Sequence, residues 1–490
     1  MPVRPFSRGQ NWLLPPSLDD LVPSDHPVRF VAAFVEGLDA TTWAELAIVV
    51  TGEARGAPAY DARVLLGAWL YGFMSGVRSS RKLEMACRDQ VPYLWLTGWQ
   101  RPDHNTLWRF YQAHRDSMRG LLTRTVRTAV QADLVDVAVQ AVDGTKVLGN
   151  AARDQVYDAE GLARLLARTE AAIAQLEAQN AGDGDLPPAR LPAELTQAHA
   201  LQTRVQDALR RVQAEDGPPH INLTDPDTVL VRTRQGVAPG YNAQAVVAPL
   251  DAPPGQPAGR LITAAAVVAT ADDHPQLLPM LAHAEATTER AAAVTLADGG
   301  YHSGPNLAAC AARGTAVVMP EAQQQALQAP YHKDRFVYAP ATDTFTCPHG
   351  QVLTFAHRKQ RAARSPVRVY RATGAVCRRC PAFGRCTRDA RQGRSLEIGP
   401  YDTALRTHRA LMATAAARAQ YRHRGPLVEG VFGILKEQLG ARRFLLRGLA
   451  NVQAEWALLA TAFNLRTLWR RWRHRLGPGG RAMPLGATVL

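Results

Sequence analysis

The chain has 490 residues, 46% of them hydrophobic, and carries a formal net charge of +14 from 57 Lys and Arg against 43 Asp and Glu. This length suits two or three domains with substantial cores, and no stretch approaches the roughly 18 consecutive apolar residues of a membrane span. Residues 1–12 lack the apolar core of a signal peptide. We therefore expect a cytoplasmic protein, away from any membrane, whose positive charge favours a polyanionic partner.

Residues 1–135 have the pattern of a wholly helical domain. Apolar residues recur at helical intervals through 28–38, 64–74 and 107–130. Two helices with a short connector between Ser79 and His114 could form a helix-turn-helix that reads DNA, or could serve packing or dimerisation. The basic residues that suggest DNA are Arg78, Arg81, Lys82, Arg101 and Arg109.

Two aspartates each close a short apolar run rich in β-branched residues. Asp143 stands in VQAVDGTKV and Asp298 in AVTLADGGY, and a glycine follows each of them directly. This pattern predicts buried strands that end at the aspartate and enter a turn, which exposes the carboxylate at the rim of a sheet. Taken singly, each could equally be a turn former or a helix cap.

After the first strand, residues 155–216 predict an inserted helical hairpin with a Gly/Pro-rich loop at 180–192. From Asp158 to Asp216 there are ten acids and six arginines. The hairpin is therefore a poor candidate for DNA contact, and we expect a structural or protein-binding element.

Beyond the hairpin the pattern indicates a mixed α/β sheet covered on both faces. An antiparallel pair is expected at 240–250 and 261–269, joined through residues 252–259. Helices at 273–288 and 305–314 then alternate with strands at 291–299 and 315–320. The acids of TDPD, Asp225 and Asp227, are expected to form a turn rather than to bind metal.

A second insertion, residues 321–400, contains four of the six cysteines. Cys377 and Cys380 form a Cys-x2-Cys pair, Cys386 follows, and Cys347 lies upstream. Thiolates at this spacing suit a tetrahedral Zn²⁺ that would organise a segment poor in apolar residues, and the alternative is free thiols in a reducing compartment. The other two cysteines, Cys87 and Cys310, lie in apolar helical contexts typical of a core.

Glu429 lies in a stretch with helical spacing, seven residues before Lys436. Seven residues are about two helical turns, so one face could carry both a metal ligand and a cation for phosphate. Basic segments flank this helix: residues 358–394 carry twelve Lys or Arg and one acid, and 442–475 carry eight Arg and one acid. They suit contacts with DNA phosphates, or are solvated surfaces.

The three carboxylates Asp143, Asp298 and Glu429 form a donor set for a hard metal ion. Mg²⁺ takes oxygen ligands, keeps several waters and needs few protein carboxylates when substrate phosphates complete its shell. Two such ions can serve both the attacking and the leaving oxygen of a phosphodiester displacement. The residues thus indicate metal-assisted phosphodiester chemistry on nucleic acid.

Over nearly its whole length the sequence resembles the DDE transposases of bacterial insertion sequences. The resemblance rests on VDGTKV, on ADGGYHS and on the order Tyr421, Arg424, Glu429 and Lys436, with six residues between the last two and four between Arg424 and Glu429, where three are commonest. Further matching strings are YGFMSGVRSSRKLEMACRD, RPDHNTLWRF, NLTDPD, GYNAQ and ALLATAFNLRTLW.

The resemblance implies an RNase H-like catalytic core over residues 136–470, interrupted by both insertions and followed by a basic tail at 471–490. It implies that Asp143, Asp298 and Glu429 hold two Mg²⁺ or Mn²⁺ ions, while Lys436, Arg424 and Tyr421 position phosphates. The substrates would be double-stranded DNA, both terminal inverted repeats and target, bound by a homodimer. The alternatives are an RNase H-like nuclease without strand transfer and a non-catalytic DNA-binding protein derived from a transposase.

Overall fold

The computed structural model describes residues 17–48, 59–180, 193–233, 236–251, 259–321, 329–361 and 364–476. The chain forms two compact units, neither of which is one continuous segment. Unit 1 comprises Met1–Asp136, Gly144–Ala271 and Glu429–Leu490, and unit 2 comprises Val137–Asp143 and Asp272–Val428. None of the helices in these described ranges combines the length and the apolar character needed to span a bilayer.

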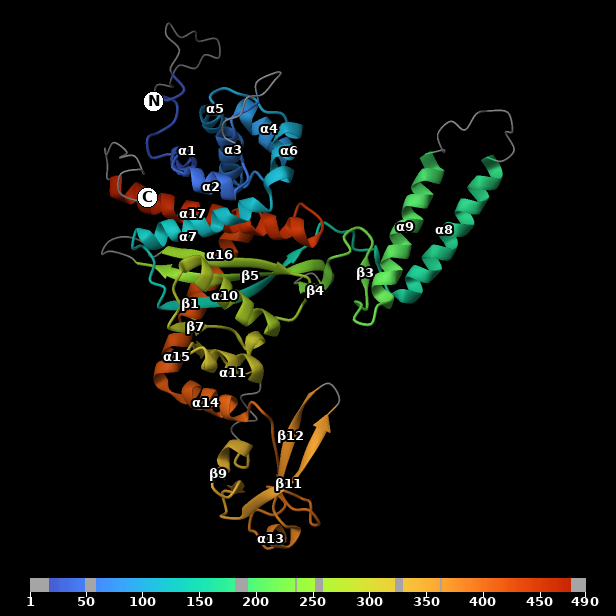
Figure 1. Cartoon of the computed structure of the whole chain (residues 1–490), viewed down its shortest axis with the longest axis vertical. Coiled ribbons are helices and arrows are strands. Elements are labelled where there is room, and N and C mark those ends of the chain that lie inside the picture. The colour runs from blue at the N-terminus through green and yellow to red at the C-terminus, as the bar shows by residue number, and fades with distance from the viewer. Residues whose placement is uncertain are drawn as a thin grey trace, which may run out of the picture. The chain divides into compact units, whose positions relative to one another are not determined.

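Unit 1 begins with helices and contains no strand before residue 136 in its described part (Figure 1). The helices are α1 (Pro27–Glu36), α2 (Ala40–Glu45), α3 (Ala62–Ser75), α4 (Ser80–Asp89), α5 (Val91–Leu96), α6 (His104–His114), the short η1 (Ser117–Arg119) and α7 (Gly120–Gln131). The helix predicted at 107–130 is therefore interrupted. The hydroxyl of Ser117 donates to the carbonyls of His114 and Leu46 at this break, an alternative to regular helical bonding.

Helix α17 (Leu449–Leu476) is the central core helix of unit 1. It packs against α3, α7 and strand β6, and much of its length is buried on all sides. The buried Asn464 accepts from the backbone N–H of Ile262 and donates to the carbonyl of the same residue, which fixes the helix to β6. Arg471 is also buried and donates to the carbonyl of Asp251, so the basic C-terminal stretch begins within the packed part of α17.

The side chain of Arg78 is buried, whereas Arg81, Lys82, Arg101 and Arg109, the other basic residues that suggested a DNA-reading surface, are exposed. Its guanidinium forms a buried ion pair of 2.8 Å with Glu455 of α17 and donates to the carbonyl of Arg443. Glu455 also accepts from the backbone N–H groups of Leu445 and Leu446. Burial, opposed by the charge of Arg78, raises the pKa of Glu455. This pair ties the N-terminal helices to α17.

The predicted antiparallel hairpin is confirmed as β5 (Gly236–Leu250) and β6 (Gly259–Val268), and β4 (Val229–Thr233) pairs antiparallel with the first residues of β5. The expected connection at 252–258 lies outside the described residues. In the preceding TDPD turn, the buried Asp225 accepts from the hydroxyl of Tyr241 and from the N–H of Gly448. Asp227 accepts from Leu449, the first residue of α17. Both acids therefore have structural partners.

Strand β1 (Val139–Leu148) runs through Asp143, so the turn predicted at Asp143–Gly144 is wrong. Its first half pairs in parallel with β7 (Val294–Leu296), which pairs in parallel with β8 (Ala316–Val318). Beyond Gly144 it lies beside β5, where the N–H of Gly149 donates to the carbonyl of Pro239. Pairing on both sides keeps β1 extended. The strand order β4-β5-β1-β7-β8, with β6 on β5, confirms a mixed α/β sheet.

Several helices in the described part of unit 2 lie between or after these strands. The region predicted as helix 273–288 is η2 (His274–Gln276) continued by α10 (Leu277–Thr288), and the next predicted helix is α11 (Gly304–Ala312). Later in the chain come α14 (Asp402–Ala413), which packs on α11, and α15 (Ala415–Tyr421).

The helical hairpin predicted within 155–216 is present as α8 (Ala159–Asn180) and α9 (Ala193–Gln213), which lie side by side (Figure 1). Its Gly/Pro-rich loop lies outside the described residues. The strands β2 (Val156–Tyr157) and β3 (Ile221–Asn222) pair at its base. A small apolar cluster closes the base around Leu162, Val205, Ala208, Ile221 and Leu223.

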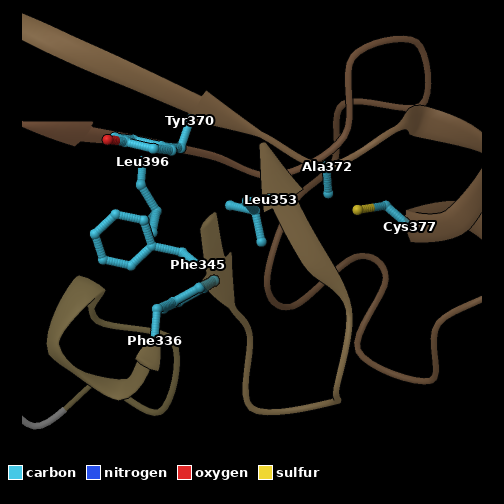
Figure 2. Packing of buried hydrophobic residues seen from close by; sticks show 7 residues of the cluster. All are labelled: Phe336, Phe345, Leu353, Tyr370, Ala372, Cys377 and Leu396. Carbon is cyan, nitrogen blue, oxygen red and sulfur yellow. The ribbon is translucent and has the colours of Figure 1, made fainter. Parts of the chain in front are cut away.

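The cysteine-containing segment of unit 2 has a sheet and a core of its own. The antiparallel order is β13-β12-β11-β10-β9, formed by β9 (Val337–Ala339), β10 (Thr344–Thr346), β11 (Val352–Arg361), β12 (Arg364–Arg371) and β13 (Ser395–Ile398). Figure 2 shows the buried cluster on this sheet, which contains Phe336, Phe345, Leu353, Tyr370, Ala372, Cys377 and Leu396. The view of this segment as too poor in apolar residues to fold is therefore wrong.

Candidate active site

The register of β1 against β7 explains how two aspartates come together in unit 2. Ala141 of β1 is paired with Leu296 of β7 in a parallel ladder. Asp143 and Asp298 each lie two residues beyond that pair, towards the carboxyl end of their strands. Two paired parallel strands keep the same register along their length. Residues that lie equally far beyond a paired position therefore reach the same level of the sheet, which places the side chains of Asp143 and Asp298 near each other.

A cation joins the two carboxylates. One guanidinium nitrogen of Arg424 lies 2.8 Å from Asp143 Oδ1 and 3.8 Å from Asp298 Oδ2. The Arg424 and Asp143 side chains are 12% and 15% exposed, whereas Asp298 is 39% exposed. Arg424 is the first residue of α16 (Arg424–Glu437). The arrangement resembles a divalent-cation site in one respect, namely that positive charge offsets two adjacent carboxylates.

The chain turns sharply after β7, and this turn fixes Asp298. The Asp298 carboxylate accepts from the N–H of Gly300 at 2.8 Å and caps the short helix η3 (Gly299–Tyr301). A Cβ at position 300 would lie 2.9 Å from Asp298 Oδ1 and 3.5 Å from an oxygen of Asp273. Only glycine therefore fits at this position without moving an acid.

Asp273 and Tyr301 belong to this neighbourhood and were not singled out as site residues in the sequence. Burial raises the pKa of the Tyr301 hydroxyl, and the charges of Asp273, Asp143 and Asp298 add to the shift, while Arg424 opposes it. Tyr301 is fully buried. The signal available in the sequence was ADGGYHS itself, where Tyr301 follows the second aspartate by three residues.

Tyr421, the last residue of α15, interacts electrostatically with Arg424, Asp298 and Asp143 as well. Burial raises the pKa of its hydroxyl, Arg424 lowers it, and Asp298 and Asp143 raise it further. Tyr421 is half-buried. Unit 2 thus contains Asp143, Asp298, Arg424 and Tyr421 in one electrostatic environment.

Glu429 and Lys436 lie on the part of α16 that belongs to unit 1. Glu429 is exposed, while the buried face of the helix consists of Val428, Val431, Phe432 and Leu435. Lys436 Nζ donates to the hydroxyl of Thr145 and to the carbonyl of Lys146. These two acceptors are on β1, directly after Asp143–Gly144. Lys436 is therefore anchored to the strand that carries the first aspartate.

In unit 2, Cys347, Cys377, Cys380 and Cys386 all line one cavity of about 20 Å³. Their thiols are free of disulfide bonds. In the part of the chain that the structure describes, no three His, Cys, Asp or Glu side chains are grouped as a metal site, neither at the aspartates nor at the cysteines. The side chains of Cys87 and Cys310 are buried elsewhere, as expected of core residues.

Two family models match the chain. One, described as a transposase DDE domain, matches residues 346–469 and so covers the cysteines, Tyr421, Arg424, Glu429 and Lys436. The other, described as a transposase domain (DUF772), matches residues 16–113, the region of α1 to α6. No curated protein and no solved structure matches the chain.

Proposed function

Because the chain belongs to the insertion-sequence transposases, we propose that it cuts DNA at the ends of its own insertion sequence and joins the freed 3′ hydroxyl to target DNA. The observation that carries this proposal is the pair of carboxylates, Asp143 and Asp298, that parallel strands bring to one level and Arg424 neutralises. The sheet, with antiparallel β6 and β5 followed by parallel β1, β7 and β8, supports an RNase H-like core.

Asp143, Asp298 and Glu429 are the residues that would hold the metal ions. Their donor atoms are all carboxylate oxygens, the type that Mg²⁺ and Mn²⁺ prefer. When bound, two such ions supply an activated attacking oxygen and stabilise the leaving oxygen. The exposure of Glu429 supports its assignment, because a ligand must reach solvent-borne ions and the substrate.

Arg424 would have two partners in turn. In the protein without DNA it neutralises Asp143 and Asp298, which spares two adjacent carboxylates their mutual repulsion. With its charge no longer needed by the two carboxylates, the guanidinium would be available to bind a substrate phosphate, for which its planar fork is suited. Arg424 thus keeps the site formed before it acts on DNA.

Lys436 and Tyr421 would position the phosphates on either side of the cut. The bonds of Lys436 to Thr145 and Lys146 fix its ammonium group beside β1. A fixed cation next to the scissile bond lowers the cost of bringing a phosphodiester to two carboxylates. Tyr421, half-buried among the same charges, would donate its hydroxyl proton to a phosphate oxygen.

Contacts with the rest of the DNA would come from basic residues away from the carboxylates. On α4 to α6 and the loops beside them, Arg81, Lys82, Arg101 and Arg109 are exposed, which supports contact with the element's terminal repeats. Two copies of the chain, one for each element end, would form the active complex. The acidic hairpin α8–α9 would contact protein rather than DNA.

A joining assay separates this proposal from a nuclease of the same fold. The substrate is the inverted repeat read from genomic DNA beside the open reading frame, supplied with a free 3′ hydroxyl, together with a supercoiled plasmid as target. A transposase produces covalently joined donor and plasmid in Mg²⁺. Cleavage of the repeat without any joined product would assign the chain to the nuclease alternative.

A further inference from the structure

Four cysteines from three separate places in the chain line one cavity in the segment that carries the β9–β13 sheet. Cys347 follows β10, Cys377 lies in α13 (Gly374–Arg378), and Cys380 and Cys386 belong to the turns after that helix. All four line the same cavity of about 20 Å³, enough for about one water-sized occupant. We propose that this cavity binds one structural Zn²⁺ through the thiolates of Cys347, Cys377, Cys380 and Cys386.

The first thiol lies in a tight turn whose backbone is directed at the sulfur. The N–H of Gly350 donates to the carbonyl of Cys347 at 2.9 Å, and Gly350 has a φ of 77°, in the left-handed region that glycine tolerates. The N–H of Gln351 then donates to Cys347 Sγ at 3.3 Å. This bond fixes the position of a sulfur that would bind zinc as a thiolate.

Cys377 has the same kind of environment. The N–H of Arg394 donates to Cys377 Sγ at 3.3 Å, across 17 residues of chain. The N–H of Cys380 donates to the carbonyl of Cys377, which closes the Cys-x2-Cys turn. Two sulfurs from different segments thus each accept a backbone N–H while they line one cavity, a pattern that packing of neutral thiols does not require.

The turn that carries Cys386 is held by its own backbone bonds. The N–H of Cys386 donates to the carbonyl of Ala382, and the N–H of Gly384 donates to the carbonyl of Thr387. Gly384 has a φ of 87°, so the turn again depends on glycine. Cys386 is thereby held at the cavity although eight residues lie between it and Cys377.

The surroundings are basic, which favours an anionic centre. Arg394 lines the cavity, donates to the carbonyls of Cys386 and Tyr331, and has a buried Nε without an acceptor in the described part of the chain. Four thiolates around Zn²⁺ carry a net charge of −2, which Arg394 would partly neutralise.

Thiolate chemistry selects the metal and the ligand set. Soft sulfur ligands favour Zn²⁺ over the hard ions expected at the aspartates. His349 also lines the cavity, but its ring stacks on Tyr331 at 6.0 Å between centroids. In the described part of the chain the four cysteines line the cavity without forming a metal-ligand group, so zinc binding would require their sulfurs to move closer together. Zinc would then fix α13 and its turns to the sheet.

The test measures zinc in the purified full-length protein after dialysis against metal-free buffer, by plasma mass spectrometry. The expected result is about one zinc per chain, and loss of most of it in the Cys377→Ser/Cys380→Ser and Cys347→Ser/Cys386→Ser variants. Cys87→Ser and Cys310→Ser are matched controls, because both thiols are buried outside the cavity, and they should keep the zinc.

A second measurement uses the wild-type chain and therefore tests the proposal even if the double variants do not fold. Replacing zinc by Co²⁺ in the wild-type chain should produce the thiolate-to-cobalt charge-transfer bands and the intense visible bands of tetrahedral sulfur ligation. Asp143→Asn and Glu429→Gln should leave the zinc content unchanged, which separates this site from the proposed magnesium site. Wild-type protein without zinc and without those cobalt bands, or double variants that keep full zinc, would overturn the proposal.

Discussion

The guanidinium of Arg424 lies 2.8 Å from the carboxylate of Asp143, and both side chains are largely buried. The same nitrogen is 3.8 Å from Asp298, so one cation serves the two acids that the sheet brings together. The guanidinium therefore supplies positive charge between the two carboxylates, and under our proposal a metal ion would have to replace it there.

Arg424→Ala should therefore increase the affinity of the free protein for Mn²⁺. Removing the competing cation leaves two carboxylates in need of a positive charge, and the dissociation constant should fall by about tenfold, equivalent to ~1.4 kcal/mol. Titration followed by electron paramagnetic resonance measures it. Arg422→Ala is the control, since Arg422 is exposed two residues away. Unchanged or weaker Mn²⁺ binding in Arg424→Ala would show that the arginine does not occupy the metal's place.

Gly300→Ala should reduce DNA cleavage by about 10- to 100-fold, because a new Cβ 2.9 Å from Asp298 Oδ1 displaces a carboxylate that we propose holds the metal ions. The matched substitution is Gly433→Ala on α16, where a Cβ has open space around it. That variant should cleave normally, and the better helix propensity of alanine should stabilise it by ~0.5–1 kcal/mol. Equal cleavage by both variants would contradict the proposed importance of the turn.

His408 should make the protein sensitive to acid. Burial, with smaller contributions from His302 and Arg409, lowers the pKa of His408 to about 4. The unfolded chain binds this proton near pH 6.5, so stability is complete above that pH and declines as pH falls towards 4. Between about pH 7 and pH 5 the loss should be about 2 kcal/mol.

Thermal unfolding at those two pH values measures this loss. His408→Phe should unfold with a smaller difference between them, whereas the exposed His220→Gln should behave as the wild type does. If His408→Phe showed the same acid sensitivity as the wild type, the buried imidazole would not be its source.

Arg78→Ala should destabilise unit 1 by about 3–5 kcal/mol, because it leaves the carboxylate of Glu455 buried without its cation. Urea unfolding followed by tryptophan fluorescence reports this through the buried Trp456 of α17. Arg88→Ala, which breaks an exposed ion pair with Glu84, should cost at most about 1 kcal/mol. Similar losses in the two variants would be inconsistent with a structural role for the buried pair.

Local patterns predicted most of the elements. The β5–β6 hairpin, the paired helices α8 and α9 and the helix bearing Glu429 depend on contacts between neighbours in sequence, or on one helical face. The strand before Asp298 and its turn were predicted for the same reason, since Gly299 and Gly300 follow at once.

Long-range pairing explains what the sequence could not predict. Asp143–Gly144 has the composition of a turn, yet β1 continues because partners at least 90 residues away in sequence hold it on both sides. The interaction of Arg424 with both aspartates also depends on segments far apart in the chain. The sheet of the cysteine segment was not predicted because the residues of its core are widely spaced in sequence, between Phe336 and Leu396, and form no continuous apolar pattern.

The most direct test of the proposed chemistry is cleavage of end DNA in Mg²⁺ by Asp143→Asn, Asp298→Asn and Glu429→Gln. Each substitution keeps the shape of the side chain and removes the charge that would hold the ions, so cleavage should fall by about 1,000-fold or more, ~4 kcal/mol. End binding, measured in parallel, should change little. Glu437→Gln, an exposed acid on the same helix, should cleave normally. Cleavage at the wild-type rate by any of the three variants would contradict the account.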